Sequence, residues 1–153
     1  MSSAPARAGA DAKLLELGIE YEWRWAVEEP LKEESERLWN AVDRLRYEKL
    51  GIDPDNREAC VAYLNDHHSE WMQARDVADE EVGYSKAWHK MDRASRQTER
   101  VGKKILKIAS STVAGLLVRI RVIETHDGIL DGEPAEQLLT EIREFSKRIG
   151  EQS

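Results

Sequence analysis

The amino-acid sequence predicts an all-α fold, arranged as a long antiparallel helical hairpin or bundle with two shorter helices at its C-terminal end. Apolar residues recur every three or four positions through most of the 153 residues, which is the period of an amphipathic helix. Hydrophobic residues make up 41% of the chain and charged residues 35%, as expected for helices that each expose a wide polar face. Strand-like alternation is confined to Leu116–Ile123, where a single strand would have no partner, so this stretch is also interpreted as helix.

The first long helix is expected over Asp11–Leu50, after a flexible start over residues 1–10. Asp11 is a plausible N-cap, and Gly51 is a natural residue to follow the last turn. Pro30 interrupts the helix, either as a kink in one helix or as the start of a second. We favour a kink or break that nearly keeps the direction, because the apolar register resumes unshifted. That register consists of Leu14, Leu17, Tyr21, Leu31, Ser35, Leu38, Val42 and Leu45.

The second long helix is expected over Pro54–Lys107. Asp53 supplies a capping side chain, and nothing beyond it strongly breaks a helix, although Gly83 could mark a bend or short loop. Helices of this length in a small protein usually pair as a hairpin.

Two shorter helices should follow. Ser110, Ser111 and Thr112 offer capping chemistry for a helix over Ser111–Thr125. A turn over His126–Gly132 then leads to a last helix over Pro134–Ile149, which should end at Gly150. The expected organisation is one helical domain over residues 11–150 and a tail over residues 151–153.

The sequence predicts a cytoplasmic protein that does not enter the membrane. The first residues have no apolar core and one basic residue, Arg7, unlike a signal peptide. The longest uncharged stretch, Ile108–Val118, is far shorter than the roughly 20 residues that span a bilayer. Cys60 has no second cysteine to pair with, which favours a reducing compartment and a buried structural thiol.

Charge is distributed unevenly along the chain. The net charge is −7, yet Lys86–Arg121 holds ten basic and two acidic residues, a net charge of +8. Within this block, basic residues recur every three or four positions and form a stripe on one helical face. The stripe could bind nucleic-acid phosphates, or it could lie against the acidic residues of Glu28–Glu36, which we favour because the chain as a whole is acidic. Its members are Arg93, Arg96, Arg100, Lys103, Lys104 and Lys107.

The run Ile108–Leu116, followed by Arg119 and Arg121, resembles a segment of small helical proteins of unassigned function from alphaproteobacteria and their prophages. Those proteins carry a Pro-Ala-x-Thr-x-Ala-Gly-Leu stretch and then spaced Lys or Arg residues, after a long charged helix. The matching residues here are Thr112-Val113-Ala114-Gly115-Leu116, whereas Ser110 departs from the pattern and the proline is absent. The resemblance implies a helical hairpin and a bacterial or phage origin, and it implies no activity or functional residue.

No catalytic, metal or cofactor site is predicted. His67 and His68 are adjacent and point about 100° apart on a helix, so they cannot share one ion as helical neighbours. The chain contains no His-x-x-x-His, no Glu-x-x-His, no glycine-rich phosphate loop and no nucleophile elbow. An enzyme would need a site assembled from distant residues.

Tryptophans point instead to protein contacts. Most of the five tryptophans should pack between helices. Trp23 and Trp25 are two positions apart and point to nearly opposite sides of a helix, so one of them should be exposed unless two surfaces of that helix are covered. We therefore expect a non-enzymatic interaction module that binds a protein partner or itself, with a coiled-coil-like seam and Trp23 and Trp25 as candidate interface aromatics. Nucleic-acid binding or regulation through the basic stripe is the alternative.

Overall fold

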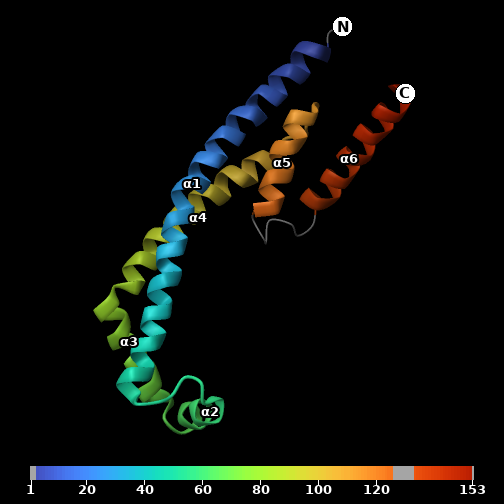
Figure 1. Cartoon of the computed structure of the whole chain (residues 1–153). Helices are drawn as coiled ribbons and strands as arrows, with labels where there is room; N and C mark the ends of the chain where they lie inside the picture. Colours follow the sequence, from blue (N-terminus) through green and yellow to red (C-terminus); the bar gives the residue numbers. More distant parts are fainter. Residues whose placement is uncertain (1–2, 126–132, 153) are drawn as a thin grey trace. The chain divides into compact units, whose positions relative to one another are not determined.

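The all-α prediction is confirmed by the computed structural model (Figure 1). It describes residues 3–125 and 133–152, with side chains over 11–125 and 136–149, and these residues form six helices without a strand among them. The expected turn at His126–Gly132 lies outside the described residues. The helices are α1 (Ser3–Leu50), α2 (Arg57–Asp66), α3 (His68–Val82), α4 (Tyr84–Leu106), α5 (Val113–Thr125) and α6 (Glu133–Gln152).

Helix α1 begins before its predicted start and passes through its predicted interruption. It starts at Ser3 rather than Asp11, because the intervening alanines favour helix and Asp11 is engaged elsewhere. Pro30 lies inside it, where it removes one backbone hydrogen bond while the apolar register continues on both sides. The helix ends as predicted at Gly51, which has a φ of 66°. The amide of Gly51 donates to the Glu48 carbonyl at 3.2 Å and that of Ile52 donates to the Tyr47 carbonyl at 3.1 Å, which together form a Schellman motif.

The prediction of one helix over Pro54–Lys107 is wrong, because three helices occupy this stretch. Asn56 caps α2 by accepting a hydrogen bond from the Ala59 amide at 3.1 Å, in place of the expected Asp53. The chain then leaves helical geometry at His67, with φ −133° and ψ 47°. Asn65 and Asp66 precede this break, and their side chains compete for backbone hydrogen bonds, a signal too weak to place the break from sequence. The bend expected at Gly83 is confirmed by its left-handed φ of 76°.

The chain divides into two compact units. Unit 1 comprises residues 1–26 and 95–153, and unit 2 comprises residues 27–94. The core of unit 1 joins three helices, with Leu14 and Tyr21 from α1, Ile105 from α4 and Val122 from α5 all essentially inaccessible to solvent. Each fully buried side chain of this size contributes about 1.5–3 kcal/mol. Burial of the same apolar surfaces therefore fixes the arrangement of the three helices around this core.

Aromatic rings join helices within unit 2, where Val42, Ala74 and Ala78 are buried. Trp39 of α1 packs on Tyr84 of α4 with ring centroids 5.1 Å apart, and Trp71 of α3 meets Tyr47 of α1 edge-on at 5.5 Å. Trp39 and Trp71 thus contact a ring of another helix, whereas Trp23, Trp39 and Trp88 are exposed, so packing of most of the five tryptophans between helices stays a prediction. The expectation of a buried thiol is wrong, because Cys60 is only half-buried.

The last two helices differ from prediction mainly at their ends. Helix α5 confirms the helical interpretation of Leu116–Ile123. Helix α6 continues through Gly150 to Gln152, since a glycine that is not left-handed need not end a helix. None of the described helices carries an apolar stretch long enough to cross a membrane.

Candidate protein-interaction site

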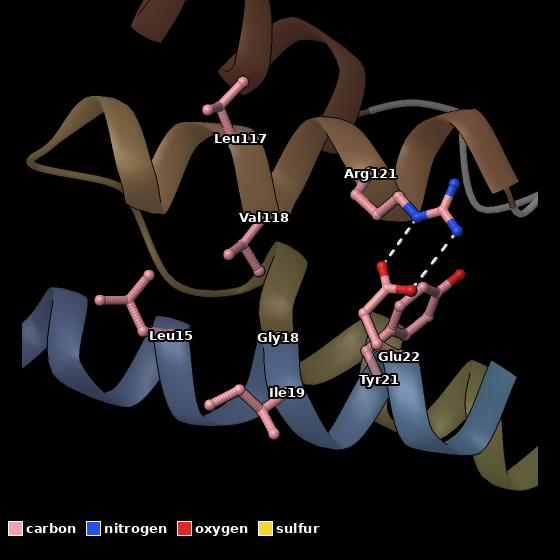
Figure 2. Close-up of a pocket in the computed structure, with 8 residues that line it drawn as sticks. All are labelled: Leu15, Gly18, Ile19, Tyr21, Glu22, Leu117, Val118 and Arg121. Atoms are coloured by element: carbon pink, nitrogen blue, oxygen red, sulfur yellow. Dashed lines mark hydrogen bonds and ion pairs between the residues drawn. The ribbon is translucent and has the colours of Figure 1, made fainter. Parts of the chain in front are cut away.

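An open groove of about 650 Å³ lies between α1 and α5 in unit 1 (Figure 2). Its floor is formed where Gly18 of α1 meets Val118 of α5. A Cβ atom at position 18 would lie 2.9 Å from Cγ2 of Val118, so the missing side chain lets the two helices approach closely. Leu15 and Ile19 line the α1 side, and Leu117 lines the α5 side.

The side chains around the groove are apolar and exposed. The exposed fraction is 42% for Leu15, 75% for Ile19 and 58% for Leu117. Single exposed apolar residues are common, but a contiguous set around a groove typically marks a surface that another molecule covers. The lining therefore favours an apolar partner over a charged small molecule.

One end of the groove is closed by an ion pair. Nε of Arg121 donates to Oε1 of Glu22 at 2.7 Å, and Nη2 of Arg121 donates to Oε2 at 3.4 Å. The hydrogen bond to Glu22 raises the pKa of Arg121, so this side chain stays charged at any physiological pH. Behind the pair, the buried Tyr21 hydroxyl lies 2.5 Å from Oγ1 of Thr125. These paired groups offer no free acid, base or nucleophile for catalysis.

Asp11 fixes the position of α5 against α1. Its buried carboxylate accepts hydrogen bonds from the Ser111 amide, at 2.9 Å, and from the Thr112 hydroxyl. The Thr112 Oγ1 in turn accepts from the Gly115 amide at 3.1 Å, which makes Thr112 the N-cap of α5. The prediction that Asp11 caps its own helix is therefore wrong, because it lies inside α1 and stabilises the start of a helix a hundred residues later.

A buried ion pair attaches α6 to α5. Arg119 is completely buried, with Nε 3.3 Å from Oε2 of Glu141 and Nη1 donating to the Ile108 carbonyl. Glu141 also accepts from the Ser110 hydroxyl at 2.8 Å. Burial lowers the pKa of Arg119, and the charge of Glu141 only partly offsets this effect. Leu138, one turn before Glu141, is buried as well.

The rest of α6 presents an apolar row to solvent. Leu139, Ile142 and Ile149 have exposed fractions of 54%, 37% and 62%. Their spacing is typical of one helical face, and this face adjoins the side of α6 that carries the buried Leu138 and Glu141. Arg143 and Lys147 are exposed elsewhere on this helix.

All six residues of the predicted basic stripe are exposed. Arg93 belongs to unit 2, and the other five belong to unit 1. Lys103 forms an ion pair with Glu99 of the same helix at 2.9 Å. Pairing of the stripe with Glu28–Glu36 stays a prediction.

The two candidate interface aromatics differ in exposure, as their spacing predicts. Trp23 is 57% exposed, and the Arg24 guanidinium lies 4.7 Å from the centre of its ring. Trp25 is half-buried and stacks on Tyr21 at 6.5 Å. Trp23 therefore extends the exposed apolar surface of α1 beyond Leu15 and Ile19.

The described histidines do not form a metal site. His67, His68 and His89 are exposed, and no three His, Cys, Asp or Glu side chains gather within the described part of the chain. His126 lies outside it. The sequence matches no protein-family model, and neither a curated protein nor a solved structure is significantly similar to it.

Several residues that shape the site were missed by the sequence analysis. Gly18 and Gly115 are the close contacts between α1 and α5, and Arg119 with Glu141 positions α6. A glycine amid the apolar residues of α1 and an arginine within an apolar segment were the available signals. Both become informative only once the partner helix is known.

Proposed function

We propose that this protein is a non-enzymatic interaction module that associates with a second copy of itself through the groove of unit 1. The observation that carries the proposal is the apolar rim of the groove, above all Ile19, which is 75% exposed. Burying a side chain of this kind contributes about 1.5–3 kcal/mol, so several such residues can support a stable interface.

The occupant we propose is α6 of the second copy. Helix α6 has the apolar row that a helix-binding groove requires, and the row is not covered within its own unit. If α6 of each copy fits the groove of the other, the two contacts are equivalent and form a closed dimer.

Charge complementarity supports this occupant. Glu16 and Glu20 are exposed on the helix that forms one wall of the groove, four residues apart. Arg143 and Lys147 are exposed on α6 at the same spacing. An α6 helix in the groove can therefore place cations beside carboxylates, which favours a particular orientation.

Sedimentation velocity of the full chain at micromolar concentration tests the proposal. We expect a dimer that becomes monomeric in the variant Ile19→Gln, whereas Val61→Gln, at an exposed apolar residue of α2, should leave the dimer intact. Circular dichroism checks that each variant retains its helices. A wild-type chain that is monomeric throughout would contradict self-association.

A charge exchange tests the proposed occupant separately. The double variant Glu16→Lys/Glu20→Lys should weaken the dimer, and adding Arg143→Glu/Lys147→Glu should restore it. A dimer that is unaffected by either pair of substitutions would rule out α6 as the occupant while leaving self-association in place.

A further inference from the structure

Another open pocket, of about 430 Å³, lies within unit 2 between α1 and α4. Its lining residues recur three or four positions apart, so they share one face of each helix. The α1 side carries Lys32, Glu36 and Trp39, and the α4 side carries Tyr84, Trp88 and Met91. A pocket of this volume is large enough to hold a small molecule.

Aromatic rings form two non-parallel walls of this pocket. The rings of Trp39 and Tyr84 have centroids 5.1 Å apart and planes inclined by 52°. Trp88 follows Tyr84 by one helical turn and lines the same side of α4. Trp39 and Trp88 are 37% and 38% exposed, so parts of both indoles are open to a ligand. The rings therefore bound a corner in which a ligand can touch more than one aromatic side chain.

The charge of the lining favours a cation in this corner. The face of an aromatic ring carries partial negative charge, and the Arg75 guanidinium already lies 5.6 Å from the centre of the Trp39 ring. Within the described part of the chain, no such cation lies over the Trp88 ring. The carboxylate of Glu36, one turn before Trp39, forms no ion pair or hydrogen bond with the described residues. The rings and the carboxylate can therefore both attract a positively charged ligand group.

We propose that this pocket binds a small zwitterion that carries a quaternary ammonium group, such as glycine betaine. The methylated ammonium contacts the aromatic rings, and the Glu36 carboxylate supplies the opposite charge. A primary ammonium is strongly hydrated and gains less from such rings. Lys32, exposed one turn before Glu36, supplies the cation that pairs with the carboxylate of the same ligand.

Other classes of ligand match this lining less well. A divalent metal ion needs several oxygen or nitrogen ligands, and no three His, Cys, Asp or Glu side chains gather among the described residues. A ligand with negative charge alone would meet the ring faces and Glu36. An uncharged apolar molecule would leave both charged groups of the lining, Glu36 and Lys32, without a counter-charge.

Isothermal titration calorimetry of the full chain with glycine betaine tests the inference. We expect saturable binding, whereas glycine, which lacks the three methyl groups, should bind about tenfold more weakly. Choline keeps the methylated ammonium but lacks the carboxylate, so it should also bind more weakly than betaine.

Two substitutions test the residues that carry the proposal. Trp88→Leu should weaken betaine binding about tenfold, because an aromatic face is lost, whereas Trp88→Tyr should retain most of the affinity. Glu36→Gln should weaken binding about threefold. Glu48→Gln makes the same change of charge at an exposed residue of α1 away from the pocket, and it should bind like the wild type. Circular dichroism checks that each variant retains its helices.

Phosphatidylcholine presents a quaternary ammonium beside an anion in a lipid headgroup, so vesicles of this lipid distinguish two sources of the ligand. Co-sedimentation of the chain with the vesicles that is lost in Trp88→Leu would identify the headgroup. Betaine binding without co-sedimentation would identify a free zwitterion.

Three results would overturn the inference. They are absence of saturable betaine binding, equal affinity for betaine and glycine, and a Trp88→Leu variant that binds like the wild type. Equal affinity for betaine and choline would overturn the assignment of a zwitterion. The result is independent of self-association, because this pocket lies in unit 2 and the groove lies in unit 1.

Discussion

Substitution of Asp11 tests whether its carboxylate holds the start of α5. Its effect on the free energy of unfolding should depend on Gly115, the residue of α5 that lies opposite. Asp11→Ala removes the acceptor for the Ser111 amide and the Thr112 hydroxyl. Loss of a capping side chain costs up to about 2 kcal/mol. Ser111 is half-buried, so water replaces the lost acceptor only in part, and we expect a loss of about 2 kcal/mol in the free energy of unfolding.

Gly115→Ala should destabilise the wild type although alanine favours helix. The new Cβ would lie 2.7 Å from Oδ2 of Asp11 and 3.2 Å from Cδ1 of Leu14. Both neighbours are buried and cannot move freely. Overpacking of this kind costs about 1–3 kcal/mol, which exceeds the gain of about 1 kcal/mol in helix propensity.

The two substitutions should therefore not be additive. In the Asp11→Ala background the close oxygen is absent, so Gly115→Ala should cost little and the coupling free energy should reach about 1–2 kcal/mol. Urea denaturation followed by circular dichroism measures the free energy of unfolding of all four chains of the cycle. Asp11→Asn, which keeps an acceptor, should lose less of this free energy than Asp11→Ala. Additivity within about 0.5 kcal/mol would refute the contact between Asp11 and Gly115.

Three further predictions concern stability. Gly18→Ala should cost about 1 kcal/mol through its contact with Val118, and Val118→Ala should remove most of that cost, as measured by urea denaturation. Arg119→Met should cost about 3 kcal/mol because it leaves the Glu141 carboxylate buried without its cation, while Arg119→Met/Glu141→Leu should recover most of the loss. Burial raises the pKa of Tyr47, so the folded state favours the neutral phenol. The contribution of Tyr47 to the free energy of unfolding is complete below pH ~10 and is lost as pH rises through the folded-state pKa. Tyr47→Phe should therefore make thermal stability less sensitive to alkaline pH.

Periodicity predicted the parts of this fold that depend on local sequence. The register through Leu14, Leu17 and Tyr21 is buried as expected, and Gly51 and Gly83 end helices because both adopt a left-handed φ. The break at His67 was missed because its neighbours only modestly disfavour helix, and tertiary packing can override such preferences.

The candidate site was less predictable because its residues act across helices. The spacing of Trp23 and Trp25 predicted that one of the two is exposed, since they point to different sides of one helix, but it did not show that the exposed one is Trp23. The pairing of Arg119 with Glu141 could not be predicted, because sequence alone does not show which charged side chains become buried together. The groove likewise depends on Gly18 lying opposite Val118, a contact between segments a hundred residues apart.

Disulfide cross-linking between copies tests the proposed dimer most directly. Two chains that lack the native thiol through Cys60→Ser would each carry one new cysteine, Leu117→Cys at the rim of the groove or Ile142→Cys in the row of α6. Under mild oxidation we expect the mixture to form a covalent heterodimer faster than either chain alone, because cysteines pair only when their Cα atoms approach within about 7 Å. Val61→Cys, on α2, is the matched exposed control and should not cross-link to either. Equal rates for the mixture and for the control would contradict binding of α6 in the groove of a second copy.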